Sequence, residues 1–76
     1  MKVIIALDAQ KQSHMGSWWD CLSWAVNSLH PPIKIHKIRP GEKYAKVIAE
    51  VDNGVIRMIP DGRQVPLKSL EGYLDG

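Results

Sequence analysis

The stretch VDNGVIRMIPDGRQVPL, Val51–Leu67, decides how the C-terminal half of the chain folds. Its Asn-Gly pair at 53–54 is the preferred pair for a two-residue type I′ hairpin turn, because both residues tolerate the positive φ angles that this turn requires. A turn at this position places Val51 directly opposite Ile56. Apolar residues alternate on both sides of the turn, which predicts an antiparallel pair of strands.

The charged residues of this hairpin favour the same register. The turn places Glu50 opposite Arg57, where opposite charges on neighbouring strands attract one another. It also places Ala49 opposite Met58, on the face that carries the alternating apolar side chains. Charge and hydrophobicity therefore predict one pairing between the two strands.

A second glycine turn, Asp61-Gly62, follows after a short apolar segment. The same geometry places Met58 opposite Val65 and Ile56 opposite Leu67, again on the apolar face. We therefore expect a three-stranded antiparallel meander with one buried face. Its strands are expected at 44–51, 55–60 and 63–67, and its buried residues are Val47, Ala49, Val51, Ile56, Met58, Val65 and Leu67.

The segment GEKYAKVIAEVDNGVIRMIPDGRQVPLKSL, residues 41–70, resembles the strand-turn-strand core of small SH3-like barrels of the Tudor kind. The resemblance implies a sheet that curls into a partly open barrel, and it implies binding rather than catalysis. Tyr44 is the only aromatic residue of the segment, so the aromatic cage of many Tudor domains has no counterpart here. No site residue is carried over from that family.

The N-terminal half is expected to add two strands to this sheet. Residues 2–8, KVIIALD, are β-branched and apolar in both alternating sets, which predicts a strand that is buried on both faces. The polar residues 9–17 are expected to form a loop. Residues 33–38, IKIHKI, alternate and predict the strand that leads into the meander.

A helix is expected at 18–29. Ser17 is a favoured N-cap residue, and Asp20 follows it at the third position, as in a capping box. Pro31 and Pro32 prevent the helix from continuing.

The composition is that of one small globular domain. Of the 76 residues, 45% are hydrophobic and 24% are charged, which argues against disorder. No apolar run approaches the roughly 20 residues that a membrane span needs. The single cysteine favours a cytoplasmic protein, because small secreted domains usually carry several paired cysteines. We predict one α+β domain over residues 1–76, in which an antiparallel β-meander, or a partly open SH3-like barrel, packs with one Trp-rich helix.

The tryptophans are the first candidates for a binding surface. Adjacent helical residues point about 100° apart, so Trp18, Trp19 and Trp24 cannot all enter one core equally. An exposed tryptophan, expected at Trp24 or Trp19, would anchor a partner protein, since binding hot spots are enriched in this residue. His14 and Met15 in the preceding loop would form the rim. The alternative is that two tryptophans pack on the sheet and the third is half-exposed without a binding role.

A basic segment indicates a second function. The net charge is only +2, but residues 34–46 contain five lysines and arginines and one acid. Such a cluster can contact nucleic-acid phosphates, or it can be an ordinary solvated face. The residues of this alternative nucleic-acid site are Lys34, His36, Lys37, Arg39, Lys43, Lys46 and Arg57.

Catalysis is the third hypothesis. Cys21 in the first helical turn precedes His36 on a strand, an order that resembles that of papain-like peptidases and would suit a Cys-His hydrolase. A free cysteine is more often a core residue, and no third catalytic residue follows His36. The cysteine and the histidines also lack the close spacing of metal ligands. We therefore predict no catalytic residue, metal ion or cofactor.

The sequence thus favours a small non-enzymatic protein that acts by binding another protein. Accessory and inhibitory proteins of phages and mobile elements often have this size, an analogy that suggests a similar role. A nucleic-acid-binding module is the alternative, and no membrane association is expected. An exposed sheet edge could also pair two copies of the chain into a homodimer.

Overall fold

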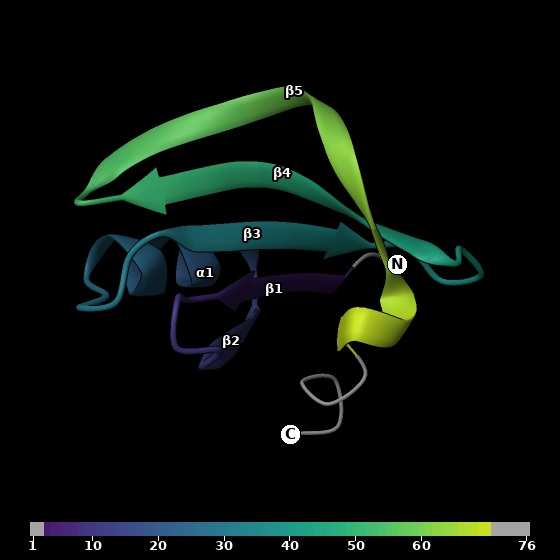
Figure 1. Cartoon of the computed structure of the whole chain (residues 1–76), viewed down its shortest axis with the longest axis horizontal. Coiled ribbons are helices and arrows are strands. Elements are labelled where there is room, and N and C mark those ends of the chain that lie inside the picture. Colours follow the sequence, from purple (N-terminus) through teal and green to yellow (C-terminus); the bar gives the residue numbers. More distant parts are fainter. Residues whose placement is uncertain (1–2, 71–76) are drawn as a thin grey trace.

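The computed structural model describes residues 3–70, apart from the side chain of Asp61, and has an α+β fold (Figure 1). The elements in chain order are β1 (Val3–Leu7), β2 (Ser13–Gly16), α1 (Trp18–Val26), β3 (Ile33–Ile38), β4 (Tyr44–Asp52), β5 (Val55–Pro66) and the 3-10 helix η1 (Leu67–Leu70). The five strands form one antiparallel sheet in the order β2-β1-β3-β4-β5. The predicted α+β class and the presence of an antiparallel meander are confirmed, but the meander consists of β3, β4 and β5 rather than of the predicted strands 44–51, 55–60 and 63–67.

The first predicted hairpin is confirmed in detail. Asn53 and Gly54, with φ angles of 51° and 81°, connect β4 to β5. Val51 pairs with Ile56, and Glu50 pairs with Arg57. The guanidinium Nη2 of Arg57 lies 3.4 Å from Oε1 of Glu50, as the sequence led us to expect.

The second predicted turn is wrong, and so is the division of 55–67 into two strands. Gly62 has a φ of 61°, but β5 continues through this residue and pairs with β4 on both sides of it. Met58 pairs with Ala49 and Arg63 with Val47. Residues 59–62 of β5 therefore lie opposite the single β4 residue between these partners, and β5 bends near its middle (Figure 1). The nine residues of β4 are long enough to pair with both halves of β5, so the glycine makes a bulge rather than a hairpin.

The bulge moves the two halves of β5 to opposite faces of the sheet. Ala49 packs in the cluster beneath α1, whereas Ala45 packs in a cluster with Leu70 of η1. Directly paired residues share a face, so Met58, opposite Ala49, and Val65, opposite Ala45, point in opposite directions. The prediction that seven meander residues share one buried face is therefore wrong.

Two small cores result, one on each face of the sheet, which we call the helix face and the η1 face. β1 contributes to both, as its two apolar sets predicted. The buried helix-face residues are Ile4, Ala6, Cys21, Ala25, Ile33, Ile35, Ala49 and Val51. The buried η1-face cluster is Ile5, Ile38, Ala45 and Leu70, with Val3, Leu7 and Leu67 packed against it.

The helix begins as predicted but ends earlier. The Ser17 side chain accepts a hydrogen bond from the Asp20 backbone N–H at 3.2 Å, which confirms the N-cap. α1 stops at Val26 rather than at residue 29, because Asn27 caps it and donates from Nδ2 to the Ser23 carbonyl at 2.9 Å. Leu29 is consequently exposed.

The predicted loop 9–17 contains an additional strand, and that prediction is corrected. Residues 13–16 form β2, which pairs with β1 at the edge of the sheet. The sequence of β2, SHMG, has no alternation of apolar residues that would indicate a strand. None of its residues is buried. In the described part of the chain β2 and β5 do not pair, so the sheet is open and a closed barrel is not shown. None of the described helices is long and apolar enough to span a membrane.

Candidate functional site

The three tryptophans of α1 have different environments. Trp18 and Trp24 are partly buried and pack against the helix-face core. Trp19 points away from that core and leaves 72% of its surface exposed. Of the two tryptophans expected to be exposed, Trp19 is exposed and Trp24 is half-buried.

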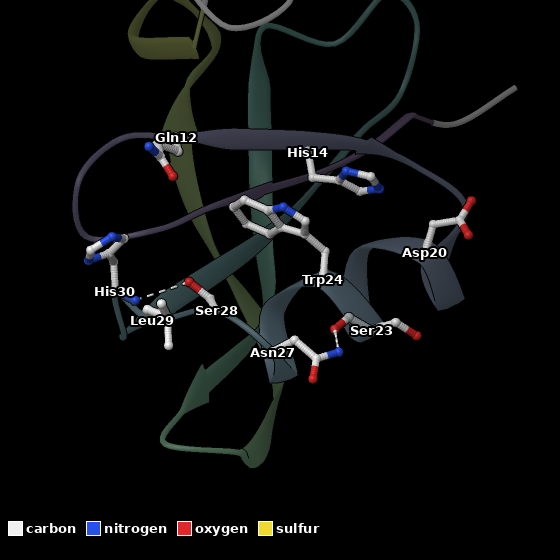
Figure 2. A pocket seen from close by; sticks show the side chains of 9 residues that line it. All are labelled: Gln12, His14, Asp20, Ser23, Trp24, Asn27, Ser28, Leu29 and His30. Atoms are coloured by element: carbon white, nitrogen blue, oxygen red, sulfur yellow. Dashed lines mark hydrogen bonds between the residues drawn. The ribbon is translucent and has the colours of Figure 1, made fainter.

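Trp24 forms the wall of an open hollow between α1 and β2 (Figure 2). Its indole stacks on the His14 imidazole, with 5.7 Å between ring centroids and 13° between the planes. The side chains around the indole are mostly polar, and the hollow has a volume of about 560 Å³. The predicted rim residue His14 therefore contacts Trp24, whereas Met15 is exposed on β2 outside the hollow. The lining residues are Gln12, His14, Asp20, Ser23, Trp24, Asn27, Ser28, Leu29 and His30.

Trp19 belongs to a different depression, which lies between α1 and β5. This Trp19 groove has a volume of about 230 Å³ and is lined by Trp19, Leu22, Ser23, Val26, Asn27 and Ile56. Because α1 packs over β1 to β4, apolar side chains of β5 stay uncovered beside it. Ile56 is 43% exposed and Met58 is 56% exposed.

The backbone of β5 offers free hydrogen-bonding groups next to this groove. β5 is an edge strand, so one side of it has no neighbour in the described sheet. In a two-residue hairpin the residues that flank the turn exchange both hydrogen bonds, and the next pair exchanges none. Val55 pairs with Asp52 at the turn, so the N–H groups of Ile56 and Met58 point away from β4. Apolar side chains and free amides thus occur at the same two residues.

The basic segment is divided between the two faces of the sheet. Lys37 pairs with Lys46 and with Ile4 of the helix-face core, so these lysines lie on the helix face. Lys34 and His36 alternate with them and lie on the η1 face. Glu50 pairs with both Lys34 and Arg57, so Arg57 also lies on the η1 face, where it is bound to Glu50 near the hairpin turn.

The remaining predicted nucleic-acid residues do not join Lys34 and His36. Arg39 lines a cavity of only about 30 Å³ together with Lys37, Glu42 and Lys46. Lys43 is exposed and lies just before the first residue of β4. The seven predicted residues therefore form no single patch.

Lys34 and His36 lie instead in a cavity of about 410 Å³ on the η1 face, which we call the Asp8–His36 cavity. Asp8 is 7% exposed and His36 is 4% exposed, and both line it. One carboxylate oxygen of Asp8, Oδ1, accepts hydrogen bonds from the backbone N–H groups of Gln10 at 2.9 Å and Gln12 at 2.8 Å. The cavity is lined by Leu7, Asp8, Ala9, Lys11, Pro32, Lys34, His36, Val47, Arg63, Val65, Ser69 and Leu70.

Two polar atoms of this cavity's residues are buried without a partner. These are Oδ2 of Asp8 and Nδ1 of His36. Burial lowers the pKa of His36 below its ordinary value of about 6.5, although the backbone of Ile5 and Lys34 partly opposes this shift, and the charge of Lys34 adds a smaller lowering. The imidazole is therefore neutral at pH 7. Sequence reasoning missed Asp8, although an aspartate just before a polar loop often accepts hydrogen bonds from the backbone of the following residues.

Cys21 is a core residue and shares no site with His36. Its thiol is fully buried on the helix face and donates weakly to the carbonyls of Ile4 and His14, at 3.6 and 3.5 Å. Burial raises the pKa of the Cys21 thiol, so this position in the first helical turn does not yield a thiolate. The sheet lies between Cys21 and His36, which is on the η1 face.

Metal ligands and relatives give no further indication of function. Within residues 3–70, no group of three or more His, Cys, Asp or Glu residues is placed to hold a metal ion. No protein-family model matches the chain, and comparisons with curated proteins and with solved structures found no match.

Proposed function

We propose that this chain is a non-enzymatic binding protein that holds an extended segment of a partner protein along β5, with Trp19 as the anchor. The observation that carries the proposal is the position of an exposed tryptophan beside the free edge of an apolar strand. The resemblance to Tudor-type domains also favours binding over catalysis.

The side chains of this surface support an apolar contact. Trp19 is 72% exposed, and Ile56 and Met58 extend the apolar surface from α1 onto β5. Contiguous exposed apolar patches are uncommon on soluble monomers and often mark interaction sites. A tryptophan at the centre of such a patch is the residue type most enriched among binding hot spots.

The backbone of β5 supports an extended partner. A peptide that adds to a sheet edge gains main-chain hydrogen bonds, and its alternate side chains enter pockets beside the strand. Here the outward amides of Ile56 and Met58 would supply the hydrogen bonds. The Trp19 groove would receive one side chain of the added segment.

The size of the chain limits how the partner can sit. A standard protein interface removes roughly 800 Å² from each partner. This is about one sixth of the 5149 Å² surface of the chain. We expect an interface of that size to include both the Trp19 groove and the edge of β5.

Capture with matched variants tests the proposal. The wild-type chain, Trp19→Ala and Tyr44→Ala are immobilised, and proteins retained from a lysate are identified by mass spectrometry. Tyr44 is a suitable control because it is 48% exposed and lies at the other end of β4. We expect a retained protein that Trp19→Ala loses and Tyr44→Ala keeps, and equal retention by both variants would contradict the assigned surface.

A second comparison tests the role of the strand edge with the captured protein after purification. Met58→Pro removes an outward amide and leaves the pairing with β4 intact, whereas Met58→Thr keeps the amide and shortens the side chain. Addition of a strand predicts that Met58→Pro weakens binding more than Met58→Thr does. If the two variants bind equally, the partner contacts side chains only and the proposed mode of binding is wrong.

A further inference from the structure

We propose that the Asp8–His36 cavity is a binding site for a small phosphate monoester that carries a hydroxyl group near the phosphate, such as a sugar phosphate. The cavity lies on the η1 face, opposite the helix face to which the Trp19 groove belongs. The inference therefore does not depend on the proposed partner protein.

The charges of the cavity favour a dianion. Lys11, Lys34 and Arg63 line it, against one carboxylate, that of Asp8. None of these three cations forms an ion pair with a residue in the described part of the chain. A phosphate monoester carries a charge of about −1.5 to −2 at pH 7, which balances this excess. The guanidinium of Arg63 can also bind two phosphate oxygens at once.

The unpaired atom of Asp8 favours a hydroxyl group beside the phosphate. Oδ1 is held by two backbone N–H groups, so the carboxylate is fixed in place, while Oδ2 is buried without a partner. Most buried polar atoms have a hydrogen-bond partner, and a carboxylate oxygen requires a donor. A hydroxyl on the ligand's carbon skeleton supplies that donor and keeps the phosphate charge away from the Asp8 carboxylate. The P–OH group of inorganic phosphate could donate to Oδ2 only by bringing its dianion next to Asp8.

His36 is a second lining residue of this cavity that carries an unpaired polar atom. Its Nδ1 is buried without a partner on a residue that is 4% exposed. A neutral imidazole nitrogen can accept from a hydroxyl or donate to an oxygen, depending on its tautomer. Two residues that each carry an orphaned polar atom, and three cations without an ion pair in the described chain, thus line one cavity.

The dimensions of the cavity suit a small molecule. Its volume of about 410 Å³ falls within the range of small-molecule sites, which is roughly 300 to 1,000 Å³. Leu7, Val47 and Val65 supply apolar contacts for the carbon skeleton. A polymer is disfavoured, because Lys37 and Lys46 lie on the other face of the sheet and cannot continue a track of cations.

Titrations of the full chain test the site directly. ¹⁵N-labelled protein in phosphate-free buffer is titrated with ribose 5-phosphate, ribose and inorganic phosphate, and amide shifts are followed by NMR. We expect ribose 5-phosphate to shift the amides of Leu7, Val47 and Val65 saturably, ribose to shift none, and inorganic phosphate to bind more weakly. The absence of a saturable shift with ribose 5-phosphate, or equal affinity for inorganic phosphate, overturns the proposal.

Variants assign the two halves of the ligand. Lys34→Gln should weaken ribose 5-phosphate binding roughly ten- to hundredfold, since a hydrogen bond to a charged group is lost. Lys46→Gln is the matched control on the opposite face and should leave binding unchanged. Asp8→Asn keeps an oxygen for the backbone hydrogen bonds but removes the repulsion, so it should narrow the preference for ribose 5-phosphate over inorganic phosphate.

Two outcomes of the variant series contradict the assignment. Equal weakening by Lys34→Gln and Lys46→Gln would show attraction to the overall charge rather than a site. If a single-stranded oligonucleotide binds and both lysine variants weaken it equally, the cations form a polymer-binding surface and the cavity proposal is overturned. Thermal unfolding of each variant separates loss of binding from loss of the fold.

Discussion

Removing one methylene group from each face of the sheet tests whether the chain has two separate cores. Ile5 is fully buried on the η1 face, and Ile35 is fully buried on the helix face. Burial of one methylene group contributes about 0.8 kcal/mol, and the cavity that remains adds a further cost. Ile5→Val and Ile35→Val should therefore each reduce the free energy of unfolding by about 1 kcal/mol. The double variant should lose about 2 kcal/mol, because the two side chains belong to separate clusters on opposite faces of the sheet.

Urea unfolding followed by tryptophan fluorescence and by circular dichroism measures these changes. A loss of 1 kcal/mol in a domain of this size also lowers the melting temperature by roughly 4 to 8 °C. Val55→Ala is the control, because Val55 is 69% exposed and its substitution should change stability by less than about 0.5 kcal/mol. Coincident transitions with both probes would show that the two cores unfold together.

The reasoning is refuted if Ile5→Val has no effect while Ile35→Val destabilises the chain. The η1 face would then not be a packed core, and the Asp8–His36 cavity would lack a rigid floor. A coupling energy well above 0.5 kcal/mol in the double variant would also refute it, because the sheet would not separate the two clusters. Additivity supports the use of variants on one face to test one site without disturbing the other.

Three further predictions concern single residues. The pKa of His36 in the folded chain lies below the ordinary value of about 6.5. Below pH 6.5 the unfolded chain therefore takes up a proton at His36 more readily than the folded chain does. The contribution of the neutral His36 to stability is complete above about pH 6.5 and falls as the pH drops below it. His36→Gln should therefore flatten the loss of unfolding free energy measured between pH 7 and pH 5, and an unchanged pH slope would contradict the burial of this imidazole. Cys21 should react with iodoacetamide far more slowly in the native chain than in denaturant, and fast native labelling would indicate an accessible thiolate. Gly54→Ala should cost about 1 kcal/mol in urea unfolding, because residue 54 has a φ of 81°, and a neutral effect would mean that the turn relaxes.

Features that depend on near neighbours in the chain could be predicted from the sequence. The turn at Asn53-Gly54 requires two positive φ angles, and few residue pairs accept them as readily as this one. The N-cap at Ser17 depends on a hydroxyl group and a backbone N–H only three residues away. The pairing of Glu50 with Arg57 follows from the turn itself, since its geometry sets the register of the strands.

The candidate sites were predicted only in part. An exposed tryptophan on the helix was expected, and helical periodicity indicated that the three could not be buried alike. The location of the groove could not be predicted, because it depends on which part of β5 lies beside Trp19. The Asp8–His36 cavity combines residues from the N-terminal loop, β3 and β5, and no short motif links them.

The same distinction explains the error at Asp61-Gly62. A glycine with positive φ fits a hairpin turn and a bulge equally well, so the local signal cannot choose between them. The choice depends on whether a neighbouring strand still has unpaired backbone groups, and β4 extends far enough to pair with both halves of β5. Such pairing brings together residues distant in the chain, and the faces on which Met58 and Val65 lie follow from it.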